Sequence, residues 1–138
     1  MYPTRLIPLI LMTLAAASPG AAESEDQAAI CAEAGQRYAE LFGHPPSEEE
    51  GVTVVTMYKY NFCPAQITVQ PGTTVRWVNV DKRTSHSVKL KDGSEPESAR
   101  LFPEETVEFT FLEPGDHDYL CGPHWDTHDM IGMVSVAE

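Results

Sequence analysis

The stretch of sequence that decides the fold is Ile67-Thr-Val-Gln-Pro-Gly-Thr-Thr-Val-Arg-Trp-Val-Asn79. Its first part, residues 67–69, alternates apolar and polar side chains as a half-buried β-strand does. Gln70-Pro-Gly-Thr73 then places Pro and Gly at the two middle positions of a type II turn. A second run of β-branched and aromatic residues follows at 75–80. The stretch therefore predicts two short strands joined by a tight turn.

The same signals recur from residue 52 to the end of the chain. The expected strands are residues 52–60, 67–69, 75–80, 87–91, 106–112, 117–121 and 131–136. Along 106–112, Val107, Phe109 and Phe111 share one face. Short strands separated by Pro- and Gly-containing turns are typical of an antiparallel β-sandwich. Because no helices alternate with these strands, the pattern argues against a parallel α/β fold and for an all-β domain.

The first 22 residues have the pattern of a secretory signal peptide. Arg5 precedes an apolar run at residues 6–17, and the small residues Gly20-Ala21-Ala22 follow it. The run is short for a membrane span, and no second apolar segment follows. The pattern predicts export to the periplasm of a protein that does not span the membrane. Residues 23–138 are enough for one domain with its own core.

A helix is expected between the signal peptide and the β domain. Ser24 with Gln27 three residues later fits a capping box, which predicts a helix over residues 24–42. An apolar stripe at helical spacing, which we expect to pack on the β domain, contains Ile30, Ala34, Tyr38 and Leu41. The acidic residues 44–51 that follow predict a solvated linker. The expected organisation is a signal peptide at 1–22, a helix and acidic linker at 23–51, and a β domain at 52–138.

The charge of the chain restricts its partners. The formal net charge is −12, and it becomes −13 without residues 1–22, which contain one arginine and no acid. A chain this acidic does not favour nucleic acids or anionic membranes. The cations that bracket His86 in the sequence are Arg76, Lys82, Arg83, Lys89 and Lys91. They form either a solvated face of mixed charge or a docking patch for a partner.

A cluster of soft metal ligands lies near the C-terminus. Within ten residues, Cys121 offers a thiolate, His124 an imidazole and Met130 a thioether. A second imidazole, His86, lies beside another expected strand. One Cys, two His and one weakly bound Met form the ligand set of a type 1 copper centre. The cluster therefore predicts one redox-active copper, cycling between Cu(I) and Cu(II).

Cys121 has alternative roles. The residue could be a buried structural thiol, which is common in strands, or a nucleophile paired with a histidine. A zinc site is a further alternative, but structural zinc sites use four Cys or His ligands and have no use for a thioether.

The cysteine count fits an oxidising compartment. The chain contains Cys31, Cys63 and Cys121, and thiols of exported proteins tend to pair. If Cys121 ligates a metal, Cys31 and Cys63 remain to form a disulfide, which explains the odd count. That bond would staple the expected helix to the β domain.

From about residue 52 to 137 the chain resembles the cupredoxin family, in a pattern similar to plastocyanin, pseudoazurin and amicyanin. The resemblance rests on residues 62–79, Ser85-His86-Ser-Val88, Gly115-Asp-His-Asp-Tyr-Leu-Cys121-Gly-Pro-His124 and residues 130–136. It implies a Greek-key β-sandwich that binds copper through His86, Cys121, His124 and Met130. It also implies a monomeric electron carrier, not an enzyme in the usual sense, that serves redox partners such as a c-type cytochrome or a copper enzyme.

Extra histidines set the chain apart from the plastocyanin-like pattern. The ligand loop is one residue longer and contains His128, which is either a group that contacts the ligands, a pH-sensitive gate or part of a second copper site. His117 stands where related proteins often have Tyr. His117 is either a hydrogen-bonded, partly buried residue or a further metal ligand. Trp125 is either a core aromatic residue or part of an apolar rim beside His124. The histidines support an alternative function, a periplasmic copper-tolerance protein with additional copper sites that binds and oxidises Cu(I).

Overall fold

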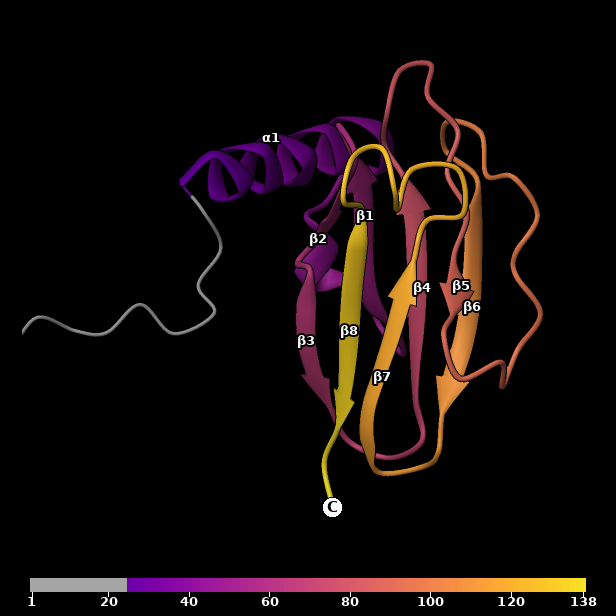
Figure 1. The fold of residues 1–138 in the computed structure, drawn as a ribbon. Helices are drawn as coiled ribbons and strands as arrows, with labels where there is room; N and C mark the ends of the chain where they lie inside the picture. The colour runs from indigo at the N-terminus through magenta and orange to yellow at the C-terminus, as the bar shows by residue number, and fades with distance from the viewer. Residues whose placement is uncertain (1–24) are drawn as a thin grey trace, which may run out of the picture.

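The computed structural model describes residues 25–138, in which two four-stranded sheets pack together as a sandwich (Figure 1). The sheets have the strand orders β2-β1-β4-β6 and β3-β8-β7-β5. The elements are α1 (Glu25–Phe42), a short 3₁₀ helix η1 (Pro46–Glu48), β1 (Thr53–Tyr58), β2 (Asn61–Cys63), β3 (Gln66–Val69), β4 (Thr73–Asn79), β5 (Lys89–Leu90), β6 (Thr106–Phe111), β7 (Gly115–Leu120) and β8 (Ile131–Val136). The expected sandwich with an N-terminal helix is confirmed.

Two sequence-based expectations concern residues outside the described part of the chain. The signal peptide expected at residues 1–22 and the capping residue Ser24 both lie there. Within residues 25–138, no helix is long and apolar enough to cross a membrane.

Both sheets are mixed, which corrects the expectation of purely antiparallel strands. β1 pairs with β4 in parallel and β3 pairs with β8 in parallel, whereas the remaining pairs are antiparallel. The turn at Gln70–Thr73 contributes to this arrangement, because it carries the chain from β3 in one sheet to β4 in the other. Gly72 has a φ of 89° and Thr73 donates its N–H to the carbonyl of Gln70, as a type II turn requires. Strands that follow one another therefore do not pair here, and more distant strands fill the places beside them.

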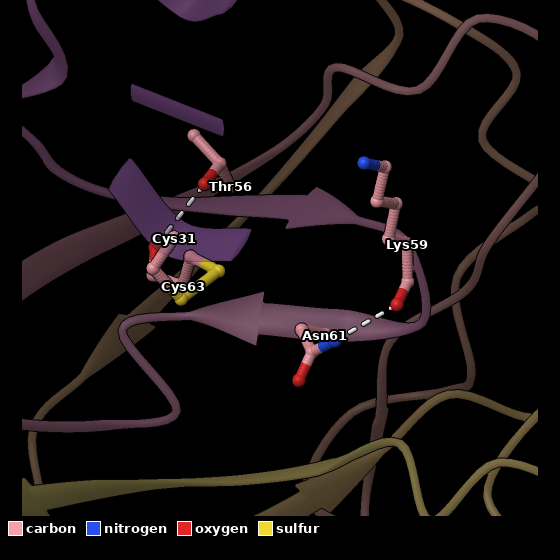
Figure 2. Close-up of a disulfide and its surroundings, with 5 residues drawn as sticks. All are labelled: Cys31, Thr56, Lys59, Asn61 and Cys63. Atoms are coloured by element: carbon pink, nitrogen blue, oxygen red, sulfur yellow. Dashed lines mark hydrogen bonds between the residues drawn. A yellow bond between two sulfur atoms is a disulfide. The ribbon is translucent and has the colours of Figure 1, made fainter. Parts of the chain in front are cut away.

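A tight turn divides the strand that was expected at residues 52–60. Lys59 and Tyr60 have φ angles of 46° and 60°, the left-handed pair that a type I′ hairpin turn needs. Residues other than Gly, Asn and Asp seldom adopt this conformation, so the sequence predicted one continuous strand. The chain instead reverses, and Tyr58 pairs with Asn61 across the β1–β2 hairpin. The Asn61 side chain donates to the Lys59 carbonyl at 2.8 Å and helps to hold the turn (Figure 2).

The core between the sheets is built around aromatic side chains. Trp77 and Tyr119 are fully buried, with ring centroids 5.1 Å apart, and Phe62 packs edge-on against Tyr119. Burial of a side chain of Phe size stabilises a fold by roughly 1.5–3 kcal/mol. Cys121 and Met130 belong to the same cluster of buried residues. The packing of the core therefore also fixes both ends of the ligand loop.

Helix α1 packs on the β2-β1-β4-β6 sheet over β1 and β2. The predicted apolar stripe of α1 contacts a second buried cluster, which includes Val54, Tyr58 and Val80. Arg37 donates its Nε–H to the carbonyl of Val80 at 2.8 Å. The expected Cys31–Cys63 disulfide is present and joins α1 to β2 (Figure 2). The helix is thus an integral layer of the domain.

The acidic linker is not simply solvated, and this expectation is wrong at Glu49. The Glu49 carboxylate accepts hydrogen bonds from the Tyr38 hydroxyl and the His44 imidazole, and it pairs with Arg76 at 3.2 Å. Hydrogen bonding to His44, the largest cause, lowers the pKa of Glu49, and the same bond raises the pKa of His44. Glu49 therefore ties the linker to both α1 and β4.

Removal of the disulfide should destabilise the fold without changing its architecture. A Cys31→Ser/Cys63→Ser double variant loses a cross-link between residues 32 positions apart, which is worth about 3–4 kcal/mol. Urea unfolding would measure the loss, and a thiol assay on denatured, metal-free wild type should find one free thiol. Three free thiols in the wild type, or an unchanged unfolding midpoint in the variant, would contradict the assignment.

The His44–Glu49 pair should make stability depend on pH. The raised pKa of His44 means that its contribution is complete below pH 6.5 and is lost as the pH rises through its folded-state value. The lowered pKa of Glu49 means that its contribution is complete above pH 4.5 and is lost as the pH falls. The difference in melting temperature between wild type and His44→Gln should therefore be largest between these values and shrink towards pH 8. Glu50→Gln, at a neighbouring exposed carboxylate, is the control and should show no such profile.

Candidate metal centre

Backbone hydrogen bonds fix the position of His86. His86 lies between β4 and β5 and forms an isolated antiparallel bridge with Leu101, with hydrogen bonds of 3.0 and 2.7 Å in the two directions. Its side chain is fully buried. The bridge and the burial together leave the imidazole little freedom to turn.

Cys121 directly follows the end of β7, and Met130 directly precedes the start of β8. The two strands pair up to Leu120 and Ile131, and the Cys121 N–H continues the ladder by donating to the Met130 carbonyl at 3.0 Å. The loop between them is folded on itself. The Cys121 carbonyl accepts from the N–H groups of His124 and Trp125, and the His124 carbonyl accepts from those of His128 and Met130. These bonds place the His124 side chain back over Cys121.

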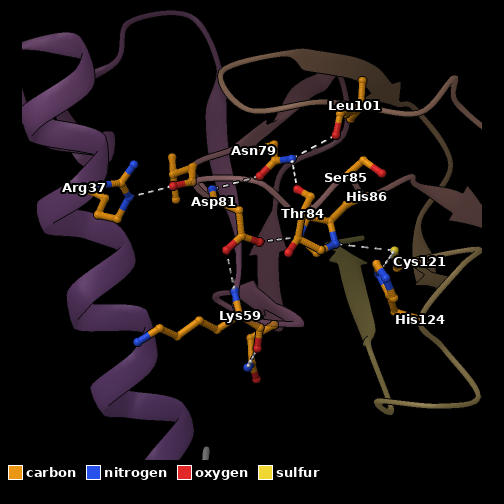
Figure 3. Close-up of polar contacts among 12 residues, drawn as sticks. Arg37, Lys59, Asn79, Asp81, Thr84, Ser85, His86, Leu101, Cys121 and His124 are labelled. Atoms are coloured by element: carbon orange, nitrogen blue, oxygen red, sulfur yellow. Dashed lines mark hydrogen bonds and ion pairs between the residues drawn. The ribbon is translucent and has the colours of Figure 1, made fainter.

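The structure brings three of the four predicted copper ligands together. The ligand atoms of His86, Cys121 and His124 all lie within 4.8 Å of one another. The Cys121 Sγ is 3.4 Å from Nδ1 of His124 and 3.8 Å from Nδ1 of His86 (Figure 3). Both imidazoles therefore direct the same nitrogen towards the sulfur. Among residues 25–138, these three side chains form the one group of His, Cys, Asp or Glu whose ligand atoms lie close enough together to hold a metal ion.

Burial sets the protonation of the metal-free cluster. It raises the pKa of the Cys121 thiol, an effect opposed by the Ser87 N–H, which donates to Sγ at 3.4 Å. Burial also lowers the pKa of His124, assisted by the neighbouring His86. A neutral imidazole offers its lone pair to a metal, and a bound cation favours the thiolate form of a coordinating cysteine. The electrostatics of the cluster therefore suit a cation at its centre.

The alternatives to copper fit these observations poorly. A catalytic cysteine is partly exposed and has a lowered pKa, whereas Cys121 is fully buried and its pKa is raised. Structural zinc needs four Cys or His ligands, and three gather here among the described residues. A buried thiolate with two imidazoles is the donor set that copper takes in type 1 centres.

The backbone of Met130 lies beside Cys121 and His124, and ligation by its side chain stays a prediction. The side chain is 1% exposed and lies in the core cluster that contains Cys121. Its backbone is fixed by the hydrogen bonds to Cys121 and His124.

The spare histidines lie outside the three-residue cluster. His117 uses both ring nitrogens, one 3.2 Å from an Asp92 oxygen and the other 2.8 Å from the Glu113 carbonyl. The pKa of His117 is raised mainly by the hydrogen bond to the Glu113 carbonyl and to a smaller extent by Asp92. His128 is exposed, and its ring stacks on Tyr60 with centroids 3.6 Å apart. Metal binding by either histidine stays a prediction.

Sequence reasoning missed two residues that contact the ligands. The Tyr60 ring lies edge-on to both His124 and His86, at centroid distances of 4.8 and 6.3 Å. The Asp81 carboxylate lies 2.5 Å from Nε2 of His86. Neither could be found from spacing, because Tyr60 depends on the unexpected hairpin turn and Asp81 on a loop of irregular structure. Trp125 is 50% exposed, so it is not the core residue that was one of its two expected roles.

The fold and this ligand set define a copper-binding cupredoxin. Residues 49–137 match the family described as copper binding proteins, plastocyanin/azurin family, and the chain belongs to that family. Copper is thus its cofactor, and His86, Cys121 and His124 are positioned for a type 1 centre.

Relatives among known proteins agree with this assignment. Amicyanin from Paracoccus versutus is 33% identical over 75 residues, covering 51% of this chain and 56% of its own. Plastocyanin from Synechococcus sp. (strain JA-2-3B'a(2-13)) is 33% identical over 85 residues, covering 53% and 61%. The chain thus spans less than two thirds of these relatives. A solved structure of a reduced amicyanin variant superposes with a TM-score of 0.57 at 28% identity, covering 66% of this chain and 88% of the other.

Proposed function

We propose that this protein is a periplasmic electron carrier that binds one copper through His86, Cys121, His124 and Met130. The observation that carries the proposal is the convergence of a buried cysteine sulfur and two imidazoles at one point of a rigid sandwich. Solved amicyanin structures of the same fold are described as reduced, Cu(I) and oxidised forms, which supports a redox-active metal. The signal peptide pattern at residues 1–22 supports export.

The ligand residues suit rapid one-electron exchange. When bound, copper supplies the Cu(II)/Cu(I) couple, taking one electron from a reduced partner and giving it to an oxidised one. The chain contributes rigidity, since His86 is held by its bridge to Leu101 and Cys121 by the β7–β8 ladder. A site whose ligands cannot move far loses little energy to rearrangement when its charge changes.

The two imidazoles differ in their access to a partner. His86 is fully buried, whereas His124 is partly exposed beside the half-exposed Trp125. We therefore assign His124 as the port through which electrons enter and leave. An exposed apolar side chain such as Trp125 would give a redox protein, such as a c-type cytochrome or a copper enzyme, a surface to dock on.

The thiolate ligand should give the copper protein its colour. Wild type loaded with Cu(II) should absorb strongly in the visible region through charge transfer from sulfur to copper. Cys121→Ser should abolish the band, because a hydroxyl does not replace the thiolate. The Cys31→Ser/Cys63→Ser variant makes the same exchange away from the site and should keep the band at temperatures where it is folded. A colourless wild type with full copper occupancy would refute the proposal.

A second candidate function is copper handling, favoured by the position of His128. This imidazole is exposed and lies 5.6 Å, between ring centroids, from His124. In this role the protein would take up Cu(I) and hold additional copper at its spare histidines. Oxidation of that Cu(I) to the less harmful Cu(II) would release one electron, which an oxidised redox partner would accept.

Copper stoichiometry separates the two functions. A simple carrier should bind one tight copper per chain, and His128→Ala should leave that number unchanged. Copper handling predicts two or more, with the excess lost in His128→Ala. His117→Ala should matter less, because both nitrogens of His117 already have partners. Metal analysis after dialysis would measure these numbers.

A further inference from the structure

A buried carboxylate is paired with one of the copper ligands. Asp81 is 8% exposed, and its Oδ2 lies 2.5 Å from Nε2 of His86 (Figure 3). Its other oxygen, Oδ1, accepts the backbone N–H of Lys59 at 3.2 Å. Within residues 25–138 no Lys or Arg side chain lies at ion-pair distance from Asp81, and the ε-ammonium of Lys59 pairs with Glu33 instead. The imidazole is therefore the main polar side-chain partner of this carboxylate.

The pair determines which nitrogen of His86 carries the proton. A carboxylate can only accept, so Nε2 must be the N–H that donates to Asp81. Nδ1 is then left with its lone pair, and it is the nitrogen that faces the Cys121 sulfur at 3.8 Å. A carboxylate in this position also fixes the orientation of the imidazole ring towards a metal.

The position of Asp81 is itself fixed by buried hydrogen bonds. The Asp81 N–H donates to Oδ1 of Asn79 at 2.9 Å. The Asn79 amide in turn donates to the carbonyls of Thr84 and Leu101, both at 2.8 Å, and Leu101 is the bridge partner of His86. The carboxylate and the imidazole that it contacts are thus held by one network.

We propose that Asp81 is a positioning residue that orients His86 and lowers the reduction potential of the copper, an inference that rests on the proposed function. The formal charges of the Cys121 thiolate and the Asp81 carboxylate together balance Cu(II), whereas Cu(I) leaves one buried negative charge uncompensated. Burying an unbalanced charge is costly, so the carboxylate stabilises the oxidised site more than the reduced one.

The test is Asp81→Asn, which keeps the shape of the side chain and removes its charge. The thiolate-to-copper absorption should remain, because the three ligands are unchanged. The Cu(II) dissociation constant should rise about tenfold relative to that of Cu(I), in line with the effect of removing such partners. For one electron this is a rise in reduction potential of about 59 mV.

Asp92→Asn is the matched control. Asp92 pairs with His117, which lies outside the ligand cluster, so the same exchange removes the same charge without touching a copper ligand. Its potential should stay close to that of wild type. If Asp81→Asn shifts the potential no more than Asp92→Asn does, the inference is overturned.

A measurement on wild type keeps the inference testable if Asp81→Asn does not fold. In the Cu(I)-loaded protein, NMR should find the His86 Nε2–H proton far downfield and slow to exchange with water. The Nε2–H of the partly exposed His124 is the internal comparison and should exchange faster. Equal, fast exchange would overturn the role of Asp81. Failure of the proposed function looks different, since wild type would then lack the visible band altogether.

Discussion

The hydrogen bond from the Cys121 N–H to the Met130 carbonyl is the interaction on which the site depends. It closes the β7–β8 ladder at the last position where the two strands still run side by side. The residues between Cys121 and Met130 then form a closed loop. Hydrogen bonds to the carbonyls of Cys121 and His124 make this loop compact. Because the ladder is anchored in the core through Tyr119 and Val134, the stability of the sandwich is transmitted directly to the ligand positions.

The N-terminal helix acts on the site through the β1–β2 hairpin. The disulfide ties α1 to β2, and Glu33 of α1 accepts hydrogen bonds from Tyr58 and Lys59 on either side of the start of the turn. The turn places Tyr60 against the imidazoles, and its Lys59 N–H reaches Asp81. Helix α1, which lies outside the residues 49–137 that match the family, is therefore connected, contact by contact, to the surroundings of the copper ligands.

The sequence predicted those features that depend on residues close together in the chain. The Pro-Gly turn, the alternating strands, the apolar stripe of α1 and the spacing of Cys121 and His124 all follow from neighbours in sequence, and the structure agrees. The parallel pairs could not be predicted, because they join strands that do not follow one another in the chain: β1 pairs with β4, and β3 pairs with β8. The left-handed turn at Lys59 was hidden by residues that carry no turn signal. Asp81 looked like one acid among many, since only the folded loop brings it to His86.

The two histidine ligands are held in opposite ways, and this asymmetry suits a carrier. His86 is buried, bridged through its backbone and paired through its side chain, so its surroundings can set the energy of the site without meeting solvent. His124 rests on a loop near the surface, where the rings of Tyr60 and His128 pack against it. The electrostatic effect of a charge beside His124 would change whenever a partner docked and expelled water. A carboxylate beside the buried His86 has the same effect in the free protein and in any complex. The driving force of electron transfer is then independent of the partner.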